Sequence, residues 1–384
     1  MKLILVAGAR PNFMKIAPLV RAIKWHNDKI GQTDMHIDFL LVHTGQHYDI
    51  QMSEVFFRDL SLPKPNINLE VGSASHAVQT AKIMIGFEGV CLAEKPDWIV
   101  VVGDVNSTMA CTLVAAKLGI KVAHVEAGLR SFDRAMPEEV NRLVTDTLAD
   151  LLLTPSPDAD QNLVREGIPR EKIRRVGNLM IDTLIDNLGR ARERLPYERF
   201  GLKEGHYVFV TLHRPSNVDD KNVLSSIMET LIGLSNRIDV VFPVHPRTRD
   251  KLISFGIWEK ARSSVSLIIT EPMNYLDTIG LVDKARFVIT DSGGLQEETT
   301  FLNIPCLTVR PNTERPITIS QGTNKLTSPD SVSEDIDHIL NGYSKQSRIP
   351  EMWDGMAGLR TVDEIVRIMG IKNEGASDGN RFIC

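Results

Sequence analysis

The sequence of 384 residues has few cysteines and no long apolar run. Its four cysteines, Cys91, Cys111, Cys306 and Cys384, lie far apart and form no CxxC pair, which favours reduced, structural thiols over a disulfide framework. No segment approaches the roughly 20 apolar residues that a membrane-spanning helix needs, and the apolar stretch at residues 1–7 is too short for a signal peptide. These absences favour a cytoplasmic protein.

A large excess of either charge is also missing. The formal net charge is −5 and the sequence pI is about 6.1, so a surface for nucleic acid or for an anionic membrane is not indicated, although a local basic pocket is compatible with both values. Hydrophobic residues make up 42% and charged residues 24% of the chain, which is ordinary for a globular protein with a sizeable core. The length fits two domains.

Short runs of Val, Ile and Leu alternate with amphipathic helical patterns along almost the whole chain. This alternation is typical of βαβ units and a parallel sheet. The pattern breaks near residues 195–205, and we predict an N-terminal Rossmann-like domain over residues 1–190 and a C-terminal one over residues 191–356. The predicted strands are residues 3–6, 38–42, 99–102, 122–125, 151–154, 173–176, 207–212, 240–243, 267–270, 287–290 and 306–309. We therefore expect two doubly wound α/β halves that face each other across a cleft.

Acidic residues follow two neighbouring strands of the first half. Asp104 comes after residues 99–102, Glu126 comes after residues 122–125, and Glu138 opens the next helix. Because ligands bind at the carboxyl ends of parallel strands, these three carboxylates are expected to converge on one crevice. Carboxylates gathered at one ligand suggest proton-transfer chemistry.

Structural roles compete with this interpretation. Asp104 can instead cap the helix that begins near residue 106, and Glu139 can pair with Arg142 on a helix surface. Glu138 and Glu139 are successive helical residues and cannot both face the crevice. Glu126 is the hardest to explain structurally, because a carboxylate at the end of an apolar strand is costly to bury without a partner or a task.

Residues 8–11 (GARP) follow the first strand and open a helix, where backbone N–H groups attract phosphate. The run is not GxGxxG, so the dinucleotide fingerprint is absent. Arg10 is a candidate to bind a diphosphate, with Lys15 one turn later as a second cation. The structural alternative, Arg10 closing a loop and Lys15 in solvent, has about equal weight.

Residues 291–298 (DSGGLQEE) form a second and more specific phosphate cradle. Ser292, Gly293 and Gly294 let the backbone approach a ligand before a helix starts, and a glutamate one turn later can accept hydrogen bonds from ribose hydroxyls. Residues 310–316 (RPNTERP) follow the last predicted strand, and an arginine held in this loop is a plausible diphosphate clamp. Taken alone, that last run is better explained as a surface loop.

Two histidines end strands of the second half. His213 is placed to donate a proton or to hold a negative charge. His245 is interpreted as structural, or as helping to shape the site. Neither histidine has metal-ligand spacing to a partner.

Taken together, these residues resemble the non-hydrolysing UDP-N-acetylglucosamine 2-epimerases. The resemblance covers nearly the whole chain, and its most specific pieces are residues 124–130 (HVEAGLR), 137–142 (PEEVNR) and 291–298. It implies a GT-B-like fold, a last helix at about residues 357–372 that packs back on the first domain, and a homodimer. It also implies an enzyme that uses neither a metal nor a nicotinamide cofactor.

The resemblance assigns roles residue by residue. It implies catalytic residues at Asp104, Glu126, Glu138 and His213, and nucleotide contacts at Arg10, Ser292, Gly293, Gly294, Glu298 and Arg315. The implied reaction is the reversible conversion of UDP-N-acetylglucosamine to UDP-N-acetylmannosamine, by elimination of UDP to 2-acetamidoglucal and its re-addition.

The sequence departs from the family pattern at two places. Relatives activated by their own substrate have an arginine that is absent from residues 72–77 (GSASHA), and the residue after Arg214 is Pro215 rather than a second arginine. These departures predict weak or absent activation by substrate. The remaining alternatives are an epimerase for a related sugar such as UDP-2,3-diacetamido-glucuronic acid, a hydrolysing epimerase, a GT-B glycosyltransferase and a non-catalytic sensor.

Overall fold

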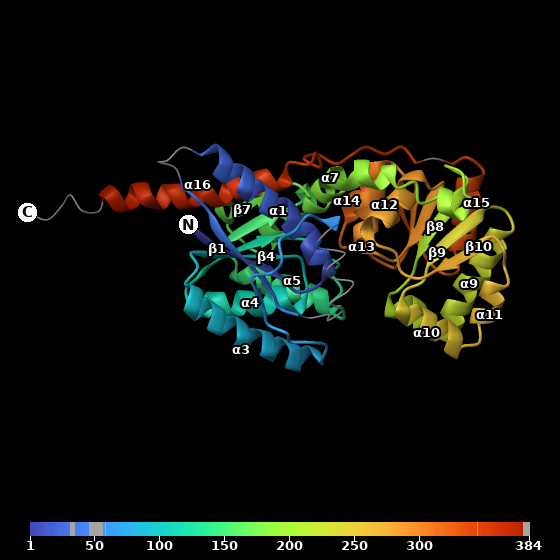
Figure 1. Cartoon of the computed structure of the whole chain (residues 1–384), viewed down its shortest axis with the longest axis horizontal. Coiled ribbons are helices and arrows are strands. Elements are labelled where there is room, and N and C mark those ends of the chain that lie inside the picture. Colours follow the sequence, from blue (N-terminus) through green and yellow to red (C-terminus); the bar gives the residue numbers. More distant parts are fainter. Residues whose placement is uncertain (31–34, 46–56, 58, 344, 379–384) are drawn as a thin grey trace, which may run out of the picture. The chain divides into compact units, whose positions relative to one another are not determined.

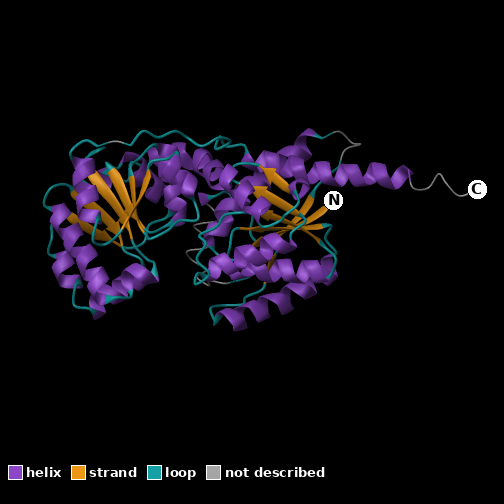
Figure 2. Ribbon diagram, turned by 180° about the vertical axis from the view of Figure 1, so that it is seen from behind, coloured by secondary structure: helices purple, strands orange, loops and turns teal. Residues whose placement is uncertain are grey.

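The computed structural model describes residues 1–30, 35–45, 57, 59–343 and 345–378; for Arg10 and residues 370–378 it describes the backbone only. The chain divides into two compact units. The first consists of Met1–Thr183 and Glu351–Cys384, and the second of Leu184–Pro350, so the division falls within helix α7 (Leu179–Glu193). Each unit has a central sheet with helices on its faces (Figures 1 and 2).

The first unit is built on a seven-stranded parallel sheet in the order β3-β2-β1-β4-β5-β6-β7. Its strands are β1 (Lys2–Ala7), β2 (Asp38–His43), β3 (Ile67–Asn68), β4 (Trp98–Val102), β5 (Lys121–Val125), β6 (Leu151–Thr154) and β7 (Ile173–Arg175). Its helices, besides α7, are α1 (Arg10–Lys29), α3 (His76–Glu94), α4 (Asn106–Lys117), α5 (Pro137–Leu148), α6 (Pro157–Arg165), the short 3₁₀ helix η1 (Arg170–Lys172) and α16 (Ala357–Asp378).

Strand β1 shows why these strands read as continuous apolar runs. Leu3 and Leu5 point to the face covered by α1 and α16. Ile4 and Val6 point to the opposite face and pack in the buried cluster that α3 and α4 complete. A parallel sheet is covered on both faces, so both sets of side chains must be apolar.

Helix α16 joins the first unit although it comes from the far end of the chain. The carboxylate of Asp182 in α7 accepts hydrogen bonds from the backbone N–H groups of Ala357 (3.1 Å) and Gly358 (2.7 Å). A β-carbon on Gly358 would lie 2.8 Å from the carbonyl oxygen of Pro18, so α16 approaches α1 closely. The helix runs to Asp378, six residues past the expected end at about residue 372.

The second unit has a six-stranded parallel sheet in the order β10-β9-β8-β11-β12-β13. Its strands are β8 (Tyr207–Thr211), β9 (Asp239–Pro243), β10 (Leu267–Thr270), β11 (Phe287–Thr290), β12 (Cys306–Val309) and β13 (Asn324–Thr327). Its helices are η2 (Glu198–Phe200), α8 (Pro215–Val218), α9 (Lys221–Ser235), α10 (Pro246–Ser254), α11 (Trp258–Arg262), α12 (Tyr275–Lys284), α13 (Gly293–Leu302), α14 (Pro316–Ser320) and α15 (Val332–Leu340). Alternate residues of β8 again enter two buried clusters, one on each face of the sheet.

In both sheets the strand order reverses beside the first strand, between β1 and β4 in one unit and between β8 and β11 in the other. The crevice outside the carboxyl ends of such strands is the usual ligand position of a doubly wound fold. Within the described part of the chain, no helix combines the length and the apolar character needed to cross a membrane.

Candidate active site

The turn between β1 and α1 is held by Asn12. Its side-chain oxygen accepts hydrogen bonds from the N–H groups of Gly8 (3.0 Å) and Ala9 (2.8 Å), and its amide nitrogen donates to the carbonyl oxygen of Val102 (2.9 Å). The start of α1 is thereby fixed beside the end of β4. The side chain of Arg10, predicted to bind a diphosphate, lies outside the described part of the structure.

Lys15, one turn into α1, is buried and forms an ion pair with Glu126, which is also buried. A β-carbon on Gly103 would lie 2.8 Å from the Lys15 ammonium nitrogen, so this cation also stands beside the residue that precedes Asp104. Lys15 is therefore not the solvated side chain of the structural alternative. It belongs to the carboxylate cluster that β4 and β5 present.

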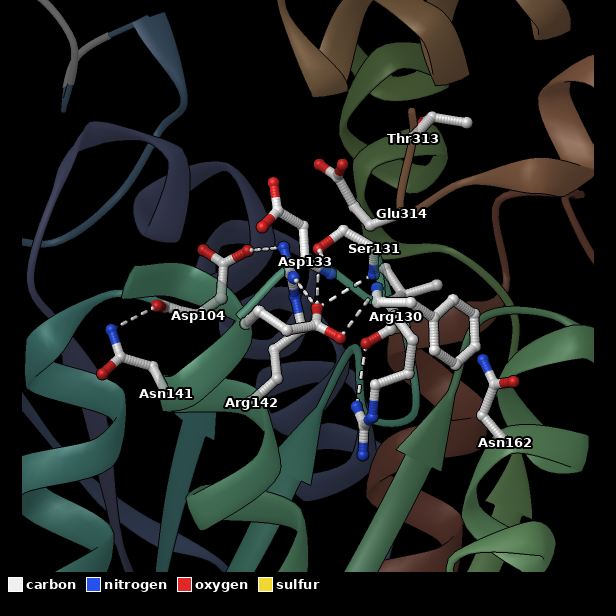
Figure 3. Close-up of polar contacts among 12 residues, drawn as sticks. Asp104, Arg130, Ser131, Asp133, Asn141, Arg142, Asn162, Thr313 and Glu314 are labelled. Atoms are coloured by element: carbon white, nitrogen blue, oxygen red, sulfur yellow. Dashed lines mark hydrogen bonds and ion pairs between the residues drawn. The ribbon is translucent and has the colours of Figure 1, made fainter. Parts of the chain in front are cut away.

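Asp104 follows β4 and pairs with Arg142 of α5, at 2.5 Å between Oδ2 and Nη2 (Figure 3). The N-cap position of α4 is occupied by Val105, so Asp104 stands one residue before the cap. Asn141 of α5 also donates to the backbone carbonyl of Asp104 (2.8 Å). Helix α5 therefore fixes both the backbone and the carboxylate of Asp104.

Glu139 is buried, not a surface residue as its pairing pattern suggested. It bonds Arg142 at 2.9 Å and accepts N–H hydrogen bonds from Ser131 (2.9 Å) and Phe132 (3.0 Å). Its neighbour Glu138 is half-buried and forms no hydrogen bond or ion pair with any residue that the structure describes. The two glutamates thus differ in burial, as successive residues of a helix do.

In the second unit, Asp291 follows β11, is completely buried and organises the end of β8. It accepts N–H hydrogen bonds from His213 (2.9 and 3.1 Å) and Arg214 (2.8 Å), and it contacts Nδ1 of His213 at 2.8 Å. Burial acts to raise the pKa of Asp291, but the contacts with His213 and the backbone N–H groups outweigh burial and hold that pKa below its ordinary value.

Because Nδ1 of His213 is held by Asp291, Nε2 is the ring nitrogen that can serve a ligand. The His213 side chain is 41% exposed. His245 stands near it, with 5.7 Å between ring centroids, and its own Nδ1 accepts a hydrogen bond from the N–H of Arg247 (3.2 Å) at the start of α10. His245 is thus a helix cap that also borders the site, in line with its structural interpretation.

Helix α13 begins at Gly293, with Ser292 as the N-cap residue and Gly294 as its second residue. A β-carbon on Gly293 would lie 2.7 Å from Nη1 of Arg315, so a guanidinium group stands at the helix N-terminus. A cation alone is unfavourable beside the positive end of a helix dipole. An anion bound at this position is stabilised by the helix dipole and by the guanidinium group. The arrangement fits a phosphate cradle.

Acidic neighbours offset the charge of Arg315. Its Nε lies 2.9 Å from Glu297, and its Nη1 pairs with Glu314, which also holds Arg310 at 2.8 Å. All four side chains are buried. The cluster keeps the guanidinium in place beside α13.

Glu298, the residue predicted to meet a ribose, is buried in α13 and accepts a hydrogen bond from the hydroxyl of Tyr275 (3.1 Å). Burial, reinforced by the charge of Glu297, raises the pKa of Glu298 to about 8 although the Tyr275 hydrogen bond acts the other way. With this pKa, the Glu298 carboxyl is mostly protonated at neutral pH.

The described residues contain no group of three or more His, Cys, Asp or Glu side chains placed to hold a metal ion. The functional contacts that sequence reasoning missed are the partners: Arg142 for Asp104, Asn12 for the β1–α1 turn and Asp291 for His213. Arg142 lies in the specific run at residues 137–142 and Asp291 in the run at residues 291–298. Their place in these motifs was the only sequence signal that they belong to the candidate site.

Two parallel Rossmann-like α/β domains, each with candidate site residues at the carboxyl edge of its sheet, define a GT-B-like protein. Residues 29–366 match the profile of the family described as UDP-N-acetylglucosamine 2-epimerase. The chain belongs to this family.

Individual relatives agree with the family assignment. The chain is 44% identical over 331 residues to the UDP-N-acetylglucosamine 2-epimerase of Methanocaldococcus jannaschii, covering 85% of this chain and 88% of the relative. The crystal structure of a Methanocaldococcus jannaschii UDP-GlcNAc 2-epimerase in complex with UDP-GlcNAc and UDP superimposes with a TM-score of 0.86 at 40% identity, covering 96% of this chain and 100% of that one. A UDP-2,3-diacetamido-2,3-dideoxy-D-glucuronate 2-epimerase of Pseudomonas aeruginosa is 39% identical, with 85% and 88% covered.

Proposed function

We propose that the protein interconverts UDP-N-acetylglucosamine and UDP-N-acetylmannosamine by inverting C2 of the sugar. The observation that carries the proposal is the pair of carboxylates at the ends of β4 and β5, Asp104 and Glu126, each held by its own buried cation. The family membership and the UDP-GlcNAc bound to the Methanocaldococcus jannaschii protein support this choice of substrate.

The chemistry begins with loss of UDP. The C2 hydrogen of the sugar is not acidic and no neighbouring ketone stabilises a carbanion. A carboxylate therefore removes the C2 proton while the C1–O bond breaks, its electron pair leaves with UDP, and a C1–C2 double bond forms in 2-acetamidoglucal. Return of a proton to the opposite face of C2 and of the UDP oxygen to C1 gives the epimer. Asp104, Glu126 and Glu138 are the groups proposed to move these protons.

Departure of the diphosphate requires stabilisation of negative charge. We assign this task to Arg10, to Arg315 and to the start of α13 at Ser292, Gly293 and Gly294. Lys15 was expected to add a second charge for the diphosphate, but its ion pair with Glu126 supports a role at the carboxylates instead.

The remaining contacts complete the proposed site. Nε2 of His213 is assigned to the diphosphate or to proton donation, since Asp291 occupies its other ring nitrogen. Glu298 is assigned to the ribose hydroxyls. We further propose a cytoplasmic location and a role in supplying activated N-acetylmannosamine for cell-surface polysaccharide.

A second candidate substrate is UDP-2,3-diacetamido-glucuronic acid, because the Pseudomonas aeruginosa relative is nearly as similar as the UDP-N-acetylglucosamine enzymes. The same elimination applies to both sugars, since they share the 2-acetamido group and the diphosphate. The two candidate substrates therefore differ in how fast the protein converts each one, and not in the type of reaction.

The test is an incubation of the protein with each sugar nucleotide in heavy water, followed by NMR of the products. We expect UDP-N-acetylglucosamine to give both epimers with deuterium at C2 and little free sugar. Faster conversion of the diacetamido sugar would move the assignment to the second candidate. Free N-acetylmannosamine would indicate hydrolysis, and no reaction with either sugar would overturn the proposal.

We also propose that two copies of the chain associate through α3, which lies on the outer side of α4 in Figure 1. Val78, Ile85 and Leu92 are spaced seven residues apart and therefore lie on one helix face. They are 47%, 74% and 58% exposed. Such a stripe of large apolar side chains indicates an interaction surface.

The stripe is complementary to itself. If two α3 helices pack antiparallel about an axis at Ile85, Val78 of each copy faces Leu92 of the other. A two-fold interface needs this kind of symmetry, so a second copy of the chain is the partner that fits.

Light scattering coupled to gel filtration tests this interface. Ile85→Glu is expected to give monomers at concentrations where the unmodified protein is dimeric. Val265→Glu is the matched control, because Val265 is 96% exposed in the second unit. A monomeric unmodified protein, or an I85E variant that stays dimeric, contradicts the assignment.

A further inference from the structure

His124, the fourth residue of β5, is completely buried and uses both ring nitrogens. Its Nδ1 lies 2.6 Å from Oδ1 of Asp146 in α5, and its Nε2 lies 2.8 Å from the carbonyl oxygen of Gly103. A carbonyl oxygen and an ionised carboxylate only accept hydrogen bonds. The ring must therefore donate from both nitrogens, which makes His124 an imidazolium cation.

Asp146 is ionised in this arrangement. Burial acts to raise the pKa of Asp146, but the contacts with His124 and Arg130 outweigh burial and lower that pKa below its ordinary value. Arg130 contacts Oδ2 of Asp146 at 2.7 Å and is itself held by Glu166 through two hydrogen bonds of 2.6 and 2.7 Å. The buried charges of His124, Asp146 and Arg130 are thus balanced with the help of Glu166, which lies at the surface.

The pair of His124 and Asp146 joins two turns. Gly103, whose carbonyl His124 binds, has a φ of +68° and immediately precedes Asp104. The second oxygen of Asp146 accepts the N–H of Gly128 (3.1 Å), which has a φ of +80°. Gly128 stands two residues after Glu126. The two turns that carry the proposed proton-transfer groups are therefore tied to one buried ion pair.

We propose that His124 and Asp146 are positioning residues, which as an imidazolium–carboxylate pair set the spacing between the turns that carry Asp104 and Glu126. The kinetic consequence rests on the proposed function; the protonation of the ring does not. Neither residue needs to touch the substrate, because their effect passes through the backbone of Gly103 and Gly128.

The size of the effect follows from the demands of proton transfer. A base must reach its proton at about 2.6–3.2 Å, and a displacement of about 1 Å costs on the order of 100-fold in rate. We expect His124→Asn to lower kcat by about 10- to 100-fold. KM is expected to change less than about threefold, because the proposed nucleotide contacts at α13 belong to the other unit.

The first test needs no variant and no activity. In the unmodified protein, nitrogen-15 NMR of labelled histidines is expected to show a directly bonded proton on both nitrogens of the His124 ring at neutral pH. A ring with one bare nitrogen overturns the proposal, even if every variant in the second test fails to fold.

The second test compares H124N, D146N and the double variant in kcat and KM, with the sugar nucleotide that the unmodified protein converts. Residues that act as one unit give non-additive losses, so the double variant is expected within about threefold of the slower single variant. Thr112→Val is the matched control. Thr112 is equally buried in the same unit, and its hydroxyl donates within α4 to the carbonyl of Thr108 (2.8 Å).

The control is expected to keep kcat within twofold while losing some thermal stability. Equal loss of kcat in T112V, or full kcat in H124N, would assign the pair a structural role only and overturn the proposal. If the unmodified protein converts neither sugar, the proposed function is wrong. The NMR experiment still decides the protonation of His124 in that case.

Discussion

Lys15 and Glu126 form a buried ion pair in the first unit, and Glu126 is one of the carboxylates that we propose to move protons. Glu126 has a φ of +70°, a conformation that costs a residue with a side chain about 1 kcal/mol or more. A strained, buried carboxylate at the end of a strand is maintained against its cost, which is the usual condition of a functional residue. Lys15 makes this placement tolerable.

We predict that Lys15→Met lowers the free energy of unfolding by about 3–5 kcal/mol, because it removes the buried cation that compensates the buried charge of Glu126. The double variant K15M/E126Q is expected to regain most of that loss, since no bare charge remains. Urea unfolding of the three proteins measures the difference. A double variant less stable than K15M would show that the pair is not coupled.

Glu298 gives the second unit a dependence on pH. Its pKa is raised from an ordinary value of 4.5 to about 8 in the folded chain, so the fold favours the protonated form. The stability that this preference contributes is fully present below the ordinary pKa and is lost as the pH rises through about 8.

Between pH 5 and pH 9, without ligand, we expect the unmodified protein to lose at least about 1 kcal/mol more unfolding free energy than Glu298→Gln, which cannot ionise. Urea titrations at the two pH values measure it. Parallel pH profiles of the two proteins contradict a raised pKa at this position.

Residues at strand ends could be predicted from sequence, whereas their partners could not. Asp104 and Glu126 follow apolar runs whose length and composition mark buried parallel strands, so their place at the sheet edge follows from the pattern. Arg142 and Lys15 reach them from helices that pack in three dimensions. The sequence marked Lys15 as a candidate cation and placed Arg142 in a specific run, but it did not indicate that these side chains would be buried against Glu126 and Asp104.

At the scale of elements, the attachment of α16 depends on Asp182. Burial raises the pKa of Asp182 to about 6, although the N–H groups of Ala357 and Gly358 favour its ionised form. Since the folded pKa lies above the ordinary value of 3.8, the contribution to stability is complete below about pH 4 and is lost as the pH rises through 6.

Asp182→Asn is expected to remove this pH dependence between pH 4 and pH 7, because the amide stays neutral. Asp182→Ala is expected to cost about 1–2 kcal/mol at pH 4, since it leaves two N–H groups at the helix start without their acceptor, and to remove the pH dependence as well. Thermal unfolding at three pH values compares the variants. If D182N keeps the full pH dependence, another group is responsible.

The central strands and most helices could be predicted from the alternation of apolar runs, since both faces of each sheet are covered. The edge strands β3 (Ile67–Asn68) and β13 (Asn324–Thr327) were missed. The first has two residues and the second reads NKLT, so neither carries an apolar run. These two segments form strands because their backbones pair with the neighbouring strands β2 and β12, and their own composition does not indicate it.

At the scale of the whole molecule, the chain has the two-domain organisation that its two series of βαβ patterns indicated. The length of the chain and the periodicity of its apolar runs suffice to predict two parallel sheets, because each series of βαβ patterns supplies enough buried strands for one sheet. The site cannot be predicted in the same way, since its geometry depends on which strand ends become neighbours at the reversal of strand order.

The departures at residues 72–77 and at Pro215 lead to a prediction about kinetics. Because the arginine that the family resemblance associates with activation by substrate is absent, rates are expected to rise hyperbolically with substrate, with a Hill coefficient near 1. UDP-N-acetylmannosamine alone is expected to be converted. Initial rates in both directions measure this, and a sigmoidal curve with an inert UDP-N-acetylmannosamine would refute it.

The central claim is that carboxylates at the ends of β4 and β5 remove the C2 proton as UDP leaves the sugar. It is tested most directly with UDP-N-acetylglucosamine that carries oxygen-18 in the bond between C1 and the diphosphate. If UDP departs, the label mixes with the other oxygens of the β-phosphate, and phosphorus NMR shows the shift; Glu126→Gln is expected to slow this mixing together with deuterium uptake at C2. Epimerisation in heavy water with the label still confined to the C1 bond would contradict the account.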